Sequence, residues 1–203
     1  MRLPPGLPPP HLVEPCGEEE EEEDSCWQWG DLAELRVHQD GENCYQLQWR
    51  VRGQSVVEDC IDIGEAHWYG GPEERVQHFP MRRENIRGRV AYLPGDMIND
   101  GQKYFGGVAE PVWVTSKGAG LTVETEQPLF YSWNEDNTGS LCLSTQHTEP
   151  YQVRGDTLQL DYTLCASQNA LTMFKLMAGT FWKLPTGIPD EKVSLRERKR
   201  RET

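Results

Sequence analysis

Apolar and polar residues alternate along much of the middle of the chain, which is the pattern of half-buried antiparallel strands. The longest alternating run covers residues 44–52, and its apolar face consists of Tyr45, Leu47, Trp49 and Val51. Shorter apolar runs, separated by turns rich in Gly, Asn and Asp, predict strands at residues 32–37, 112–116, 120–125, 129–133, 141–145 and 157–165. Short strands at this spacing predict a mostly β fold, built as an antiparallel β-sandwich.

One short helix is predicted near the C-terminal end of the chain, over residues 168–178. Ser167 stands directly before it and can cap its first turn. Apolar residues at helical spacing predict the face that packs on the sandwich, which consists of Leu171, Phe174 and Met177 or Ala178.

Both ends of the chain differ from the middle in composition. Residues 1–26 hold six prolines and eight acidic residues, most of them in the run Glu18–Asp24. Residues 191–203 hold six basic and three acidic residues and only two aliphatic ones. Neither segment can bury a core, because proline fixes extended backbone and like charges repel one another. We therefore expect a disordered acidic tail at 1–26, a sandwich domain at 27–183 and a disordered basic tail at 191–203.

The charge balance limits the partners that the chain can have. It holds 20 Lys and Arg against 33 Asp and Glu, a net charge of −13, which argues against nucleic acid as a partner. No apolar run approaches the roughly 18 residues that a membrane-spanning helix needs. The first 15 residues also lack the apolar stretch of a secretory signal, which favours a soluble intracellular product.

Six cysteines stand at positions 16, 26, 44, 60, 142 and 165. Without a CxxC pair or a nearby His they predict no zinc site, and the chain shows no other metal or cofactor motif. Cys44 and Cys60 lie on consecutive apolar stretches, as do Cys142 and Cys165, so either pair could bridge neighbouring strands. The alternative is that all of them are buried, reduced thiols that pack as small apolar side chains.

The segment His67–Gly71 gathers three aromatic residues, His67, Trp68 and Tyr69, in front of two glycines, Gly70 and Gly71. Aromatic faces beside flexible turns are typical of sugar binding, since a pyranose stacks on an indole and its hydroxyls need polar partners. The same residues are equally typical of a buried aromatic corner, where glycine permits a positive φ.

Residues near this segment also permit two enzymatic alternatives. Two carboxylates across a cleft can hydrolyse a glycosidic bond, and a His–Glu pair can open a sugar ring as a mutarotase does. The candidates are Asp59, Asp62, Glu65, Glu73 and Glu74 for the first reaction, and His67, His78 and His147 for the second. Their spacing is not diagnostic, and a serine nucleophile elbow and a phosphate-binding glycine loop are absent. These residues alone do not predict an enzyme.

Several segments of the chain resemble the N-terminal region of family 31 glycoside hydrolases, in the branch of the myogenesis-regulating glycosidase and the SITS-binding protein. The resemblance spans roughly residues 40–190. The segments that carry it are CYQLQWR at 44–50, EDC at 58–60, GEAHWYGGPE at 64–73, HFPM at 78–81, VWVTSKGAGLTVE at 112–124, LCL at 141–143 and LDYTLC at 160–165.

The resemblance implies a galactose-mutarotase-like β-sandwich, the domain that precedes the (β/α)8 barrel in this family. It also implies disulfides between Cys44 and Cys60 and between Cys142 and Cys165, because that branch is membrane-anchored with a lumenal or extracellular catalytic part. This implication opposes the intracellular location expected from the missing signal, and the compartment stays open.

The resemblance carries over no catalysis, since the barrel supplies both catalytic aspartates of the family. Residues 184–190, LPTGIPD, look like the linker that leads into the barrel, and the basic tail follows them. We therefore expect a stand-alone or truncated, non-catalytic relative that binds carbohydrate through residues 67–71 or docks to a barrel-bearing chain through an exposed face. The alternative is that the chain is one part of a glycoside hydrolase completed by a separate barrel.

Overall fold

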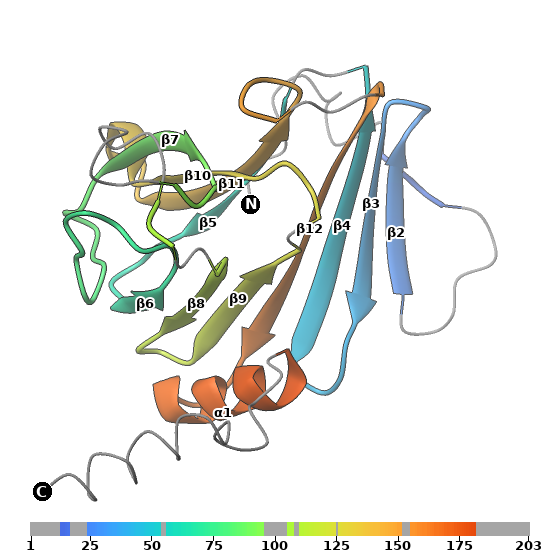
Figure 1. Cartoon of the computed structure of the whole chain (residues 1–203). Coiled ribbons are helices and arrows are strands. Elements are labelled where there is room, and N and C mark those ends of the chain that lie inside the picture. Colours follow the sequence, from blue (N-terminus) through green and yellow to red (C-terminus); the bar gives the residue numbers. More distant parts are fainter. Residues whose placement is uncertain are drawn as a thin grey trace, which may run out of the picture.

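The structure, a computed structural model, describes residues 13–16, 24–53, 56–95, 105–107, 110–124, 126–151 and 155–181 of the chain. Two antiparallel sheets face each other, and a single helix lies across one end of the larger sheet (Figure 1). The predicted mostly β sandwich with one helix near the C-terminal end is thereby confirmed. The predicted linker at 184–190 and the predicted basic tail at 191–203 lie outside the described residues.

The larger sheet has eight strands. Across the sheet, the first four strands lie in chain order and the last four lie in reverse chain order. In spatial order these strands are β1 (Glu14–Pro15), β2 (Asp24–Trp29), β3 (Ala33–Gln39), β4 (Cys44–Arg52), β12 (Thr157–Ala166), β9 (Ala119–Val123), β8 (Val112–Thr115) and β6 (Trp68–Gly70). The smaller sheet contains β5 (Val56–Asp62), β11 (Ser140–Gln146), β10 (Phe130–Trp133) and β7 (Arg87–Ala91), and a 3₁₀ turn at Glu135–Asn137 links two of them.

The core lies between the two sheets and is rich in aromatic side chains. Trp113 of β8 stacks on Tyr131 of β10 with ring centroids 5.7 Å apart, so the contact joins the two sheets. The side chains of Leu47, Trp49 and Val51 are buried, as the alternation along β4 predicts. Other fully buried members of this core include Trp133, Tyr162, Phe105, Leu121, Leu141, Leu143, Leu158 and Leu160.

One carboxylate, that of Asp59, is buried inside this apolar core. Its Oδ2 accepts hydrogen bonds from Trp49 Nε1 at 3.1 Å and from the Tyr162 hydroxyl at 2.6 Å, and its Oδ1 accepts one from the Cys60 N–H. Because Asp59 lies on β5 and its partners lie on β4 and β12, these bonds tie the two sheets together. Burial raises the pKa of Asp59 above its usual value, although the three hydrogen bonds act in the opposite direction.

The cysteines form three disulfides, and the pairing differs from the one that the family resemblance implied. Cys44 is bonded to Cys165, and Cys60 is bonded to Cys142. The implied pairs, Cys44 with Cys60 and Cys142 with Cys165, are wrong, because strands consecutive along the chain belong to different sheets. Each observed disulfide instead joins two directly opposed residues, across β4 and β12 and across β5 and β11.

The sandwich also extends beyond the boundary expected at residue 27. Strand β2 begins at Asp24 and pairs along its length with β3, and the short strand β1 pairs with β2. The third disulfide, between Cys16 and Cys26, fastens this edge. The boundary was set too late because the prolines and the acidic run that stand before β2 dominate the composition of residues 1–26. The remaining residues of the predicted acidic tail, 1–12 and 17–23, lie outside the described residues.

Helix α1 (Ala170–Thr180) packs on β8 and β9 with only part of the expected face: Met177 and Ala178 are buried, whereas Leu171 and Phe174 are not. Its N-cap is Asn169 rather than Ser167, since the Asn169 side chain accepts a hydrogen bond from the Thr172 N–H. Met173 and Met177 are fully buried against the Cys44–Cys165 disulfide, whereas 64% of Leu171 and 53% of Phe174 is exposed. The helix is therefore apolar on two faces, and one of them points away from the sheet.

Candidate functional site

An apolar groove lies on the outer face of the larger sheet, between edge strand β6 and helix α1. Figure 1 shows β8 between these two elements. Its volume is about 710 Å³. Strands β6 and β8 form its floor, α1 forms one wall, and the loop after β6 forms the other. The lining residues are Tyr69, Gly70, Gly71, Phe79, Glu110, Val112, Val114, Phe174 and Phe181.

The alternation of side chains along β6 divides the predicted site residues between two faces. Trp68 is 4% exposed, packs edge-on against Trp133 at 5.5 Å, and donates its Nε1–H to the Ile63 carbonyl oxygen. It therefore belongs to the core and cannot stack on a ligand, contrary to the role expected for it. Tyr69 points the other way, into the groove, where its ring meets Phe79 edge-on at 5.3 Å.

His67 is exposed at the start of this segment, and it does not line the groove. Its backbone N–H donates to the Ser116 hydroxyl at 3.0 Å, which holds the segment beside the turn that joins β8 and β9. Of the five residues predicted to contact a sugar, the structure brings Tyr69, Gly70 and Gly71 together on the groove and separates the other two from it.

The two glycines are required by the close approach of the chain to β8. Gly70 has φ of 102°, and a Cβ on it would lie 2.2 Å from the Val112 carbonyl oxygen. Gly71 has φ of 77°, and a Cβ on it would lie 2.5 Å from Trp113 Nε1. Its N–H donates to the Val112 carbonyl oxygen at 2.7 Å. Only glycine fits such positions, so the corner interpretation of these two residues is confirmed.

The acidic and histidine residues considered for catalysis are scattered, and none of them lines the groove. Asp59 lies in the core, Asp62 accepts a hydrogen bond from the Gly64 N–H, and Glu74 lies 3.8 Å from Arg87. Burial raises the pKa of Glu74, and the charge of Arg87 partly offsets that effect. The others, Glu65, Glu73, His78 and His147, likewise lie outside the groove lining.

Sequence reasoning missed Glu110, Phe174 and Phe181 as groove residues, whereas Phe79 belongs to the same aromatic-rich segment, residues 59–80, as Tyr69 and the two glycines. The double apolar character of α1 was a usable signal for Phe174, because a helix with apolar residues on two faces has one face left over after packing.

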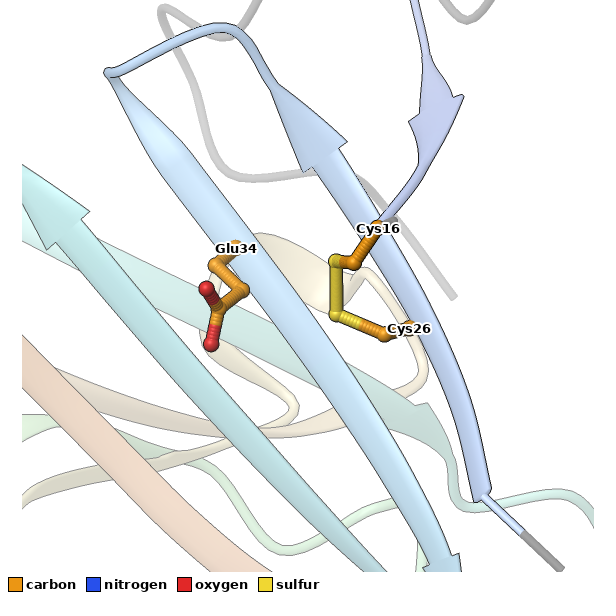
Figure 2. A group of neighbouring side chains, drawn as sticks. All are labelled: Cys16, Cys26 and Glu34. Atoms are coloured by element: carbon orange, nitrogen blue, oxygen red, sulfur yellow. A yellow bond between two sulfur atoms is a disulfide. The ribbon is translucent and has the colours of Figure 1, made fainter. Parts of the chain in front are cut away.

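Two groups of side chains within the described part of the chain contain residue types that can bind a metal ion. In each, two cysteines and a glutamate place their ligand atoms within 4.8 Å of one another: Cys16, Cys26 and Glu34 in one, and Cys60, Cys142 and Glu58 in the other. Figure 2 shows the Cys16 and Cys26 sulfurs bonded to each other beside the Glu34 carboxylate. A sulfur in a disulfide offers no thiolate, so the oxidised protein does not fit a metal at either place.

No helix in the described residues combines the length and the apolar character needed to cross a membrane.

Comparison with known proteins identifies the relatives of this fold. The mouse (Mus musculus) myogenesis-regulating glycosidase is 28% identical over 153 residues, which cover 72% of this chain and 21% of that protein. The SITS-binding protein of Tetronarce californica is 28% identical over 150 residues, which cover 71% of this chain and 20% of that protein. This chain thus spans about a fifth of the length of either relative.

The solved structures support the same relationship at the level of the fold. A GH31 family sulfoquinovosidase from E. rectale, in complex with an aza-sugar inhibitor, matches 84% of this chain and 26% of its own with a TM-score of 0.53 and 12% identity. The family model of the myogenesis-regulating glycosidase N-terminal domain matches residues 33–173. This match covers more than half of the residues, and the chain therefore belongs to the family of myogenesis-regulating glycosidase N-terminal domains.

Proposed function

We propose that this chain is a non-catalytic docking domain, and that the groove beside β6 receives an apolar segment of a barrel-bearing glycosidase chain. The groove itself carries the proposal. Phe79 is 65% exposed and Phe174 is 53% exposed, and they face a single hollow of about 710 Å³ from the loop and from the helix. Single exposed apolar side chains are ordinary, but a contiguous apolar hollow is typical of an interaction site.

The composition of the groove favours a protein segment over a sugar as its occupant. A sugar presents hydroxyls on every side and needs several hydrogen-bonding partners once it is removed from water. Among the described lining residues, the only polar side chains are the Tyr69 hydroxyl and the Glu110 carboxylate. Apolar side chains of a partner protein carry no hydroxyls and therefore need no such hydrogen bonds. The single carboxylate also supports a non-catalytic role, because glycoside hydrolysis generally uses a pair.

The alternative proposal, a part of a glycoside hydrolase, uses the same contact. In it the barrel hydrolyses the O-glycosyl bond, and the sandwich supplies a supporting surface. Family membership supports this version, as does the name of the mouse relative, a glycosidase. The two versions differ in whether docking changes the activity of the barrel.

We further propose that the protein folds in an oxidising compartment, in contrast to the intracellular location expected in the sequence analysis. All six cysteines are paired in the structure. Cytosolic glutathione keeps thiols reduced, so three disulfides in one domain favour a lumenal or extracellular site. The test is the mass of the protein from cells lysed in alkylating agent without reductant: no added alkyl groups is the expected result, and six would contradict the proposal.

Docking is tested by co-expressing the full chain with the mouse myogenesis-regulating glycosidase from which its own matching region has been removed. We expect the two chains to purify together. Phe79→Asp with Phe174→Asp places two charges in the groove, and it should weaken the complex at least about tenfold, because each buried Phe contributes about 1.5–3 kcal/mol.

The matched control is Val76→Asp with Ile86→Asp, two side chains that are 61% and 60% exposed outside the groove. This control should leave the complex intact; equal loss in both double variants, or no complex with the unaltered chain, would contradict docking at the groove. The separated chain is also assayed on aryl α-glucosides and α-galactosides. Turnover above that of buffer would contradict the non-catalytic role, whereas increased turnover of the partner only in the complex would favour the glycoside hydrolase version.

A further inference from the structure

A second hollow lies on the same outer face, at the opposite edge of the larger sheet, where β2, β3, β4 and β12 run side by side. Its volume is about 330 Å³, and its lining is mostly polar. The turn between β2 and β3 closes one end of it. The lining residues are Gln28, Gly30, Asp31, Leu32, Ala33, Glu34, Arg36, Arg50, Arg52 and Thr157. We name this hollow the arginine cleft.

Three arginines converge in this cleft, although the chain as a whole carries a net charge of −13. Arg50 and Arg52 stand two residues apart on β4, so their side chains leave the same face of the sheet, about 7 Å apart at the backbone. Arg36 joins them from β3, next to the strand that carries the other two. Placing like charges on one face opposes folding unless something anionic lies between them.

The carboxylates of the cleft, Asp31 and Glu34, offset only part of this charge, because three arginines line the cleft with them. Glu34 forms its ion pair with Arg36, with Oε1 2.6 Å from Nε. Within the described part of the chain, Arg50 and Arg52 lie in no ion pair. Burial raises the pKa of the nearby Asp161, and the charge of Arg50 only partly offsets that effect. Asp161 is 6% exposed, and its Oδ2 is held by the Gln159 amide. Two exposed guanidinium groups therefore keep their donors available toward the cleft.

We propose that the arginine cleft binds a sugar unit that carries a sulfate or carboxylate group, as in an acidic polysaccharide. Guanidinium groups match the geometry of such an anion, and Arg50 and Arg52 supply two of them. The same cleft holds the Asp31 carboxylate, the Gln28 amide and the Thr157 hydroxyl, which can accept hydrogen bonds from sugar hydroxyls. Asp31 and Glu34 would repel a bare inorganic anion. An anionic sugar, in contrast, can bind the arginines through its charged group and the carboxylates through its hydroxyls.

The test is isothermal titration calorimetry on the full chain in 150 mM NaCl. Four probes are compared: a heparin-derived tetrasaccharide, a hyaluronan tetrasaccharide, maltotetraose and inorganic sulfate. We expect binding of one or both acidic tetrasaccharides. Because hyaluronan carries only carboxylates and heparin carries both anions, binding of hyaluronan assigns the carboxylate, and binding of the heparin fragment alone assigns the sulfate. Binding of neither, or binding of maltotetraose or inorganic sulfate with equal affinity, would overturn the proposal.

Two sets of variants then locate the site. Arg50→Gln with Arg52→Gln should weaken binding at least about tenfold, because charge-assisted hydrogen bonds are lost. Arg75→Gln with Lys175→Gln removes the same charge from exposed positions outside the cleft and should change the affinity less than twofold. If both double variants weaken binding equally, the interaction is general charge attraction, and the assigned site is overturned.

A change at Asp31 separates sugar recognition from anion attraction. Asp31→Asn removes a negative charge, so it should strengthen any residual attraction for inorganic sulfate. It also weakens an acceptor for a sugar hydroxyl, so it should weaken binding of the acidic tetrasaccharide. Stronger binding of both probes by this variant would overturn the hydroxyl part of the proposal. The melting temperature of each variant, expected to equal that of the unaltered chain, confirms that these exposed substitutions leave the fold intact.

Discussion

The disulfide between Cys60 and Cys142 is expected to stabilise the sandwich by about 4 kcal/mol. The two residues are 82 positions apart, but the Cys44–Cys165 disulfide encloses them. In an unfolded chain that keeps the outer disulfide, the shorter covalent path between Cys60 and Cys142 runs through it and contains only about 40 residues. Closing a loop of that length removes entropy worth about 4 kcal/mol at 25 °C from the unfolded state.

The perturbation is Cys60→Ala with Cys142→Ala, and the assay is urea unfolding at 25 °C without reductant. Both side chains are half-buried on the outer face of the smaller sheet, so the substitution leaves little cavity and mainly removes the cross-link. We expect the free energy of unfolding to fall by about 4 kcal/mol. The slope against urea should rise as well, because a less constrained unfolded chain exposes more surface.

The Cys16–Cys26 disulfide provides the comparison, because it closes a loop of only 10 residues at the edge of the sheet. The same entropy relation gives about 2.7 kcal/mol for that loop. Replacing Cys16 and Cys26 by alanine should therefore cost less than replacing the inner pair. If the short loop costs as much as the long one, or if the inner pair can be removed without loss, the loop-closure reasoning is refuted.

Three further predictions concern single positions. Gly71→Ala should lower the free energy of unfolding in urea by about 3 kcal/mol, because the added Cβ meets the Trp113 indole. The control Gly64→Ala has φ of 60° and open space around its Cβ, so it should cost only about 1 kcal/mol. Similar losses in the two variants would contradict the clash. Because burial raises the pKa of Asp59, the native state holds a proton that the unfolded state releases, so stability declines as pH rises from about 4 through the raised value. Asp59→Asn removes this decline, and urea unfolding of both proteins from pH 4 to 7 should show the difference; parallel curves would refute it. Asn169→Ala removes the N-cap of α1 and should lower the free energy of unfolding by about 1 kcal/mol, with no change counting against the cap.

The sequence predicts the strands better than it predicts their partners. Alternation is a local property, so β4 and β12 follow directly from their own residues, and the mostly β class follows with them. Pairing depends on residues far apart, and β12 lies beside β4 because the chain returns from the smaller sheet to the larger one. The expected disulfide pairs were wrong for this reason. The strands β6 (Trp68–Gly70) and β7 (Arg87–Ala91) were missed, because the first has only three residues and the second holds two arginines and a glycine among its five.

The groove shows why a cluster in the sequence did not translate into a cluster in space. Consecutive side chains of a strand point to opposite faces, so Trp68 and Tyr69 cannot serve one site while both remain in β6. Both faces of the sheet are covered at this end, by the smaller sheet on one side and by α1 on the other, so aromatic character alone does not say which face is the core. Which face of β6 belongs to the core depends on Trp133 and Phe174, which come from distant parts of the chain. Trp133 packs against the indole and fixes it inside, and Tyr69 is thereby turned outward to the groove that Phe174 completes.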